Sequence, residues 1–280
     1  MKTVAIAGTG LIGASFGLAL RSAGFDGAII GVSSPGAVKA AVEAGAIDRG
    51  ASLEEAAGQA DLVFLAQTIG RIIDTLRRLD PLVKPGALVT DAGSTKCEIT
   101  DVGRQHLRRA QFLGGHPMAG KEKRGASEAS ASLFRNHTWV LTPDEPEELE
   151  TAAAKEFRGW LGKIGARVVS LDSDAHDRVV AYTSHAPQLA STALASMVAG
   201  RVTAAESTIA GSGLTDMTRL ALSSYDIWRD ILATNSGHIE RALGFYIQEL
   251  EHIRENLRTR ELQREFAKGA EFAAQIRRGK

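Results

Sequence analysis

The stretch that decides the fold is MKTVAIAGTGLIGASFGLALRSAG, residues 1–24, which admits two incompatible interpretations. A lysine followed by a long apolar run and small residues is typical of a secretory signal peptide. The same letters also place Gly8-x-Gly10-x-x-Gly13 directly after an apolar, strand-like run. Because the glycines interrupt the apolar segment and no convincing cleavage site follows, the pattern favours a nucleotide-binding turn over an export signal.

The three glycines have distinct roles in such a turn. Gly8 permits the tight bend, Gly10 leaves room for a pyrophosphate, and Gly13 lets the helix pack closely on the strand. The free N–H groups at the start of the helix then face the anion. The predicted elements are a strand at Thr3–Ala7, a helix from about Leu11 to Ala23 and a second strand at Ala28–Val32. This context disfavours the alternative, a glycine-rich turn in another α/β domain.

The end of the second predicted strand bears on which dinucleotide binds. An NAD site usually has Asp or Glu there, where the carboxylate binds the ribose hydroxyls. This chain has Ser33 and Ser34 instead, with Lys39 as the nearest cation and no arginine beside them. Since two hydroxyls without a carboxylate tolerate a 2′-phosphate, we expect NADP in preference to NAD, although a helix cap and turn also explains the serines. The predicted cofactor-binding residues are Gly8, Gly10, Leu11, Ile12, Gly13, Ser33 and Ser34.

The composition narrows the choice of partners. Lys plus Arg and Asp plus Glu both number 33, so the net charge is zero and gives no electrostatic reason to expect nucleic acid or an acidic membrane. Cys97 is the single cysteine, which excludes an intramolecular disulfide and is typical of a reducing cytoplasm. No later stretch approaches the ~20 apolar residues that span a bilayer. No ligand spacing demands a metal.

Strand and helix patterns alternate over the first part of the chain and then stop. Further strands are expected at Asp61–Ala66 and Gly86–Gly93 and within QFLGGHPM, TWVLTP and ARVVSL, with helices at Ile69–Leu79 and Leu149–Ile164. After SLDSDAHD only helical periodicity remains. We therefore predict a Rossmann-type, doubly wound α/β domain over residues 1–172 and an all-helical domain over 173–280.

Two segments of the first domain could carry chemistry. TDAGSTK places Ser94 just past the carboxyl end of a strand, where α/β sheets bind ligands, although a helix N-cap explains it equally well. GGHPMAG places His116 between glycines and a proline, which suits an accessible catalytic group better than a packed core histidine. KEKRG (Lys121–Gly125) is typical of a solvated loop, but Glu122 lies close enough in sequence to share a pocket with His116.

The helical half offers weaker signals. His185, in TSHAPQ, is typical of a structural histidine when taken alone. In GSGLTDMTRLA a helix cap is expected at Thr215 or Asp216, which would put Arg219 in the first turn. A cation is unfavourable there and so hints at a ligand carboxylate, unless Asp216 pairs with it. Helix capping accounts for Asp172 and Asp174 in DSDAHD.

The combination of GTGLIGAS, DAGSTK, GGHPMAGKEKRG, TSHAPQ and TDMTRLA with IWRDI, in this order, resembles the prephenate/arogenate dehydrogenase family. The resemblance extends from Met1 to about Ala233. It implies a homodimer formed through the helical domain. It also implies a substrate with a cyclohexadiene ring, oxidation by NAD(P) at C4, loss of CO₂ and an aromatic product on the route to tyrosine.

The resemblance also assigns roles to residues. His116 would accept the proton of the C4 hydroxyl, and Ser94 would orient His116 or the hydroxyl. Arg219 would bind a substrate carboxylate, His185 would contact the substrate, and Glu122 would pair with the ammonium of arogenate. Two other functions stay open on the sequence: another NAD(P)-dependent dehydrogenase or reductase with a helical second domain, and a non-catalytic dinucleotide sensor.

Overall fold

The computed structural model of the protein describes residues 1–121, 123, 125–259 and 261–278 and groups the chain into two compact units. The first unit is Met1–Val180 with Leu222–Asn235, and the second is Ala181–Ala221 with Ser236–Lys280. The sequence places the domain boundary at 172/173. The grouping by contacts differs from it because the helix after the last strand and residues 222–235 join the first unit.

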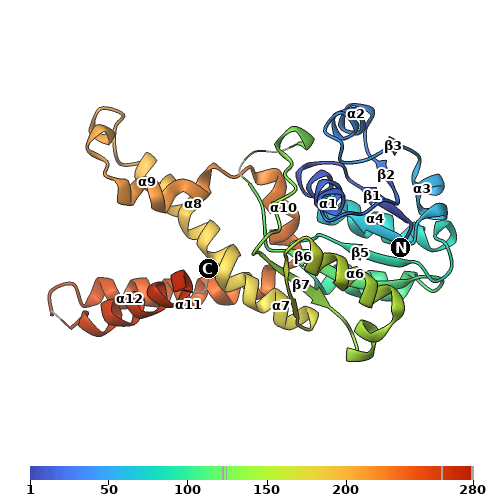
Figure 1. The fold of residues 1–280 in the computed structure, drawn as a ribbon. Coiled ribbons are helices and arrows are strands. Elements are labelled where there is room, and N and C mark those ends of the chain that lie inside the picture. The colour runs from blue at the N-terminus through green and yellow to red at the C-terminus, as the bar shows by residue number, and fades with distance from the viewer. Residues whose placement is uncertain (122, 124, 260, 279–280) are drawn as a thin grey trace. The chain divides into compact units, whose positions relative to one another are not determined.

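The first unit is built on an eight-stranded sheet with the order β3-β2-β1-β4-β5-β6-β7-β8 (Figure 1). All neighbouring strands are parallel except β6 and β7. The strands are β1 Thr3–Ala7, β2 Ala28–Val32, β3 Arg49–Gly50, β4 Leu62–Leu65, β5 Leu88–Asp91, β6 Gln111–Pro117, β7 Thr138–Thr142 and β8 Arg167–Ser170. The predicted doubly wound sheet is confirmed. The two-residue strand β3 is an additional strand, which the pattern of apolar residues did not predict.

Helices cover both faces of this sheet (Figure 1). They are α1 Leu11–Ser22, α2 Pro35–Glu43, α3 Leu53–Gln59, α4 Ile69–Leu79, α5 Cys97–His106, α6 Ala152–Lys163, α7 Ser173–Val180 and α10 Tyr225–Thr234. On one face, Phe16 of α1 packs against Phe64 and Trp139 of the sheet, with ring centroids 4.4 and 5.8 Å apart. The other face is covered by α3, α4 and α5, whose buried side chains include Ile72 and Ile99.

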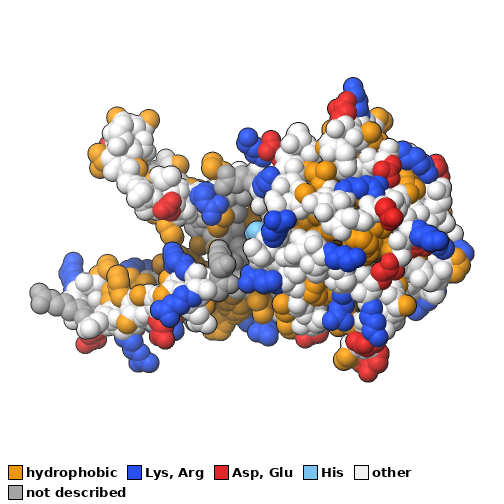
Figure 2. Space-filling model, in the orientation of Figure 1, with side chains coloured by type: hydrophobic (Ala, Val, Ile, Leu, Met, Phe, Trp, Pro, Cys, Tyr) orange, Lys and Arg blue, Asp and Glu red, His pale blue; other side chains and the backbone are white. Residues whose placement is uncertain are grey.

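The described residues of the second unit form helices and the loops between them and no strand, as predicted. A π-helical turn, Ala181–His185, leads into α8 Ala186–Ala199, followed by α9 Ser212–Thr218, a 3₁₀ turn at Arg219–Leu222, α11 Ser236–Glu255 and α12 Gln263–Arg278. Large apolar side chains are exposed on these helices, as Figure 2 shows, and Phe266 is 75% exposed.

Two features are absent from the described residues: a membrane-spanning helix and a cluster of metal-ligating side chains. None of the helices there combines the length and the apolar character that crossing a membrane requires. No three His, Cys, Asp or Glu side chains in this part of the chain gather as a metal site would require.

Candidate functional site

The glycine turn between β1 and α1 has the geometry that a dinucleotide requires. Gly8 adopts a φ of 96°, and its N–H donates to the carbonyl of Val32 at 2.9 Å. A Cβ on Gly13 would lie 2.0 Å from the Gly8 carbonyl oxygen, whereas a Cβ on Gly10 would meet no atom within 4 Å. The first turn of α1 carries no acidic residue and no side-chain cap. Its first N–H groups therefore fit an anion at this position.

A cavity of about 450 Å³ adjoins the turn, and Gly8, Ser33 and Ser34 line it. Both serines are exposed, and their hydroxyls bond to none of the residues that the structure describes. Ser34 occupies the N-cap position of α2 with Pro35 after it, but its side chain does not make the capping bond. The helix-cap alternative thus accounts for the backbone at Ser34 and leaves the hydroxyl available to a ligand.

Two arginines that are remote in sequence line the same cavity. Arg71 comes from α4 and Arg229 from α10. Arg71 is exposed and forms no ion pair within the described ranges, while Arg229 pairs with an aspartate on its own helix. Asp226 adds one carboxylate to the lining, and Lys39, the cation nearest in sequence, pairs with Glu43 on α2 instead. The cavity therefore holds more positive charge than the sequence suggests.

Helix α10 reaches this cavity because it is anchored to the first unit. The Gly70 N–H donates to Asp230 Oδ2 at 3.1 Å, and the hydroxyls of Thr95 and Thr234 lie 2.7 Å apart. Ile231 of the same helix is buried in the core beneath α4. These contacts explain why residues 222–235 belong to the nucleotide-binding unit, although the chain leaves it before and after them.

A buried ion pair lies at the carboxyl end of β5. Lys96 and Asp91 pair with each other and are both fully buried. Lys96 Nζ also donates to the Gly115 carbonyl at 2.7 Å, and Asp91 Oδ1 accepts the Gly115 N–H at 3.0 Å. Burial lowers the pKa of Lys96, and the charge of Asp91 opposes that shift. The pair thus holds both backbone groups of the residue that precedes His116.

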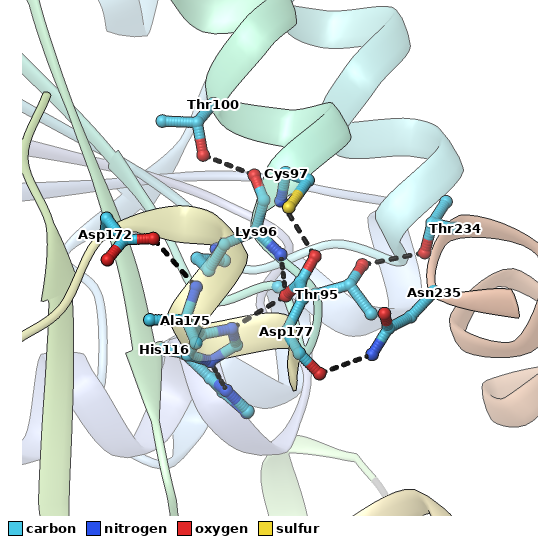
Figure 3. A network of polar contacts seen from close by, with 12 residues as sticks. Thr95, Lys96, Cys97, Thr100, His116, Asp172, Ala175, Asp177, Thr234 and Asn235 are labelled. Carbon is cyan, nitrogen blue, oxygen red and sulfur yellow. Dashed lines mark hydrogen bonds and ion pairs between the residues drawn. The ribbon is translucent and has the colours of Figure 1, made fainter. Parts of the chain in front are cut away.

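His116 lies on β6 at the start of a chain of polar contacts (Figure 3). Its Nδ1 is 2.9 Å from Nε2 of His176 on α7, and His176 Nδ1 is 2.8 Å from Asp177 Oδ1. Asp177 also accepts the backbone N–H groups of Lys96 at 2.7 Å and Cys97 at 2.9 Å. Burial raises the pKa of Asp177, but the hydrogen bonds from His176 and the two N–H groups outweigh it and lower the pKa overall. The series of polar contacts that starts at His116 therefore ends at an ionised carboxylate, that of Asp177.

Ser94 and Glu122 are not brought into this chain of contacts. Ser94 is partly exposed beyond β5 and makes no hydrogen bond with the described part of the protein. The helix-cap alternative for Ser94 is wrong, because α5 begins at Cys97 with Lys96 at its N-cap. The expected role of Ser94 stays a prediction. Glu122 lies outside the described residues.

His185 and Arg219 belong to the second unit. His185 is buried at the end of the π-helical turn, a feature that is frequent at functional sites. Arg219 lines a cavity of about 490 Å³ together with the carboxylates of Asp216 and Glu249 and with apolar side chains of α8 and α11. Gln188 Nε2 donates to the Leu220 carbonyl at 2.8 Å, so α8 holds the turn that carries Arg219.

The structure corrects the predicted placement of Arg219. Helix α9 begins at Ser212, before the expected cap at Thr215 or Asp216, and Arg219 is its C-cap. A cation is favoured at a helix C-terminus. The argument from an unfavourable dipole is therefore wrong, and only the resemblance and the cavity support a carboxylate ligand for this residue.

Sequence reasoning missed His176 and Asp177. It interpreted Asp172 and Asp174 as helix caps, which is confirmed for Asp172, whose Oδ1 accepts the Ala175 N–H at 2.8 Å. Asp174 lies inside α7, in its first turn. The next turn, however, carries the side chains of His176 and Asp177 into the interior beside the buried Val180. The available signal was that His176 and Val180, four residues apart, share one face of a short helix.

Comparison with known proteins agrees with this architecture. The family model described as "Prephenate dehydrogenase, nucleotide-binding domain" matches residues 16–170, and "Prephenate dehydrogenase, dimerization domain" matches residues 172–271. The prephenate dehydrogenase of Bacillus subtilis is 34% identical over 261 residues, which is 90% of this chain and 69% of that protein. The prephenate dehydrogenase of Lactococcus lactis is 32% identical over 240 residues, which is 84% of this chain and 65% of that protein.

Among solved structures, prephenate dehydrogenase from Aquifex aeolicus, in complex with hydroxyphenyl propionate and NAD⁺, superposes with a TM-score of 0.86. The two are 28% identical, and the match covers 99% of this chain and 98% of that one. The chain spans about two thirds of the length of the two curated relatives and nearly the whole of this structure. The chain belongs to the prephenate dehydrogenase family of NAD(P)-dependent oxidoreductases.

Proposed function

We propose that the protein catalyses the oxidative decarboxylation of prephenate or arogenate with hydride transfer to NAD(P). One observation carries the proposal. His116 follows the parallel part of β6, at the edge of the sheet where the glycine turn also lies, and its Nδ1 is bonded to a buried histidine. His116 can therefore act as a base at the same edge of the sheet as the dinucleotide site, and the dehydrogenation of an alcohol requires such a base.

The residues of the first unit account for the proton in this reaction. His116 accepts the proton of the C4 hydroxyl through Nε2, and the C4–O bond gains double-bond character as the hydride departs from C4. The nicotinamide ring, when bound, supplies the hydride acceptor. The bond from the ring to its carboxylate breaks, its electron pair enters the ring, and CO₂ leaves. The gain of aromaticity makes the step effectively irreversible.

Four further residues are proposed on the substrate side. Ser94 orients His116 or the hydroxyl, and His185 contacts the substrate. The planar guanidinium of Arg219 suits a carboxylate, and its position on a cavity wall supports this role. Glu122 pairs with the ammonium group if arogenate is the substrate.

NADP is the proposed cofactor in preference to NAD. Ser33 and Ser34 replace the carboxylate that would repel a 2′-phosphate, and Arg71 and Arg229 line the same cavity. Guanidinium groups bind phosphate through paired, charge-assisted hydrogen bonds. Among the described residues that line this cavity, Asp226 is the one acidic side chain, and it lies on the same helix as Arg229.

A homodimer formed through the second unit is the proposed assembly. The dimerization-domain match includes most of this unit, up to residue 271, and the helices of the unit expose large apolar side chains. These include Met217, Phe245, Ile247, Leu257, Phe266 and Phe272. Contiguous exposed apolar surface on a folded protein marks an interaction site.

The test is formation of reduced nicotinamide with prephenate and with arogenate, each offered NAD and NADP. We expect turnover in at least one pairing, with NADP preferred. His116→Asn should lower kcat by about 10²–10⁴, the usual contribution of a general base, and leave substrate binding little changed. No turnover in any pairing, from folded protein that binds the cofactor, would contradict the proposal and favour a related reductase or a dinucleotide sensor.

A further inference from the structure

We propose that His176 is a positioning residue, which together with Asp177 holds His116 in the tautomer that a base requires. The inference rests on the proposed function, because it concerns the same proton acceptor. The three side chains lie in line, with 2.9 Å between the two imidazoles and 2.8 Å between His176 and the carboxylate. Of these three residues, the sequence motifs single out only His116.

The direction of each hydrogen bond follows from the chemistry of its acceptor. An ionised carboxylate only accepts, so His176 must donate its Nδ1–H to Asp177. Neutral His176 then carries its lone pair on Nε2, and this atom can only accept from Nδ1–H of His116. His116 is thus left with its lone pair on Nε2. The opposite tautomer would present a donor to the C4 hydroxyl and could not accept the proton.

The same series of hydrogen bonds, from His116 through His176 to Asp177, stabilises the product of proton transfer. Once His116 is an imidazolium, its Nδ1–H donates to a neutral His176 whose other nitrogen is bonded to an anion. Both His176 and Asp177 are 1% exposed, so little water screens this interaction. The arrangement resembles in its logic a base oriented by a buried carboxylate, with one imidazole interposed.

The other charged groups near His116 do not take the place of Asp177. Lys96, at the N-cap of α5, is neutralised by Asp91 of β5. Burial, and next the charge of Asp177, raises the pKa of Cys97 to about 12, so its thiol carries no charge at neutral pH. Asp174, on α7 itself, adds a smaller effect on that thiol. Among the described residues, Asp177 is thus an anion linked to His116, and His176 is the group that connects them.

Two variants of His176 test the proposal. In His176→Phe the acceptor is lost, and we expect kcat to fall about 10- to 100-fold, part of the span of general-base catalysis. The acid limb of kcat/KM should move to lower pH, because the imidazolium of His116 loses its stabilising partner and its pKa falls. His176→Gln keeps an acceptor for Nδ1–H and should recover much of kcat. An unmoved acid limb, or equal losses in both variants, would overturn the proposal in favour of a structural role.

A measurement on the wild-type protein covers the case in which a variant does not fold. Nitrogen-15 NMR of the histidine rings distinguishes the two neutral tautomers. Above the acid limb, His116 should show a protonated Nδ1 and an unprotonated Nε2, and the reverse assignment would refute the proposal. Because this readout needs no turnover, it stays informative even if neither prephenate nor arogenate is a substrate. Absence of turnover would then count against the proposed function alone.

Discussion

Arg71 shows how a single side chain can bear on cofactor choice. It projects from α4 into the cavity that contains Ser33 and Ser34, and it forms no ion pair with the described residues. A guanidinium exposed beside two hydroxyls, with no carboxylate at the end of β2, suits the 2′-phosphate of NADP.

Replacing this side chain should therefore affect one cofactor only. We expect Arg71→Ala to raise the KM for NADP about 10-fold or more, because a hydrogen bond to a charged group contributes about 1.5–3 kcal/mol. The KM for NAD, which has no 2′-phosphate, should change by less than about twofold. The control is Arg77→Ala, which removes an exposed arginine of α4 that pairs with Asp74 instead. Equal losses for NAD and NADP would show that Arg71 does not contact the phosphate.

At the scale of elements, Asp61 joins the beginnings of two adjacent strands. Its carboxylate precedes β4, accepts the N–H groups of Lys2 and Thr3 at 2.7 and 3.1 Å, and pairs with Lys84. Burial raises its pKa, but these bonds outweigh burial and lower the pKa to about 2. The ionised form is thus favoured in the folded protein.

A pH-dependent contribution to stability follows, with a definite sign. A folded-state pKa below the ordinary 3.8 stabilises the protein above that pH and ceases to do so as pH falls towards 2. We expect Asp61→Asn to unfold more easily than wild type at pH 7, and the difference in free energy of unfolding to shrink between about pH 4 and 2. Denaturant titrations across this range measure it. A difference independent of pH would mean that ionised Asp61 contributes nothing.

Elements differ in how far the sequence could predict them. The strands at Thr3–Ala7 and Ala28–Val32 were predictable because uniform apolar runs and a glycine turn are local signals. The start of α9 at Ser212 was not, because Thr215 offers an equally good local cap and only the fold selects between them. The return of residues 222–235 to the first unit depends on contacts such as Gly70 with Asp230, which no local pattern encodes.

The candidate site divides in the same way. His116 stood out because glycines and a proline surround it, and Ser33 and Ser34 because an expected carboxylate is missing. His176 did not stand out, because a histidine beside an aspartate at a helix start is equally typical of a cap. Its significance appears only when α7 is folded against β6 and its Nε2 comes within 2.9 Å of His116 Nδ1.

At the scale of the whole molecule, the two units differ in how well they bury their apolar side chains. In the first unit, large side chains such as Phe16 and Trp139 are fully buried. In the second, Phe266 and Phe272 of α12 are 75% and 59% exposed, and Phe245 of α11 is 54% exposed. In a monomer this apolar surface would stay in contact with water, which is unfavourable in free energy. Association with a second copy would bury it.

The proposed homodimer can be tested through this surface. Burying a phenylalanine contributes about 1.5–3 kcal/mol, and in a two-fold dimer each substitution acts twice, so Phe266→Lys should raise the dissociation constant about 100-fold or more. Val42→Lys, at an exposed apolar position of α2 in the first unit, is the matched control and should leave the dimer unchanged. Analytical ultracentrifugation over a range of concentrations gives the constants. A wild-type protein that sediments as a monomer would refute the assembly, whereas an unaffected Phe266→Lys dimer would move the interface away from α12.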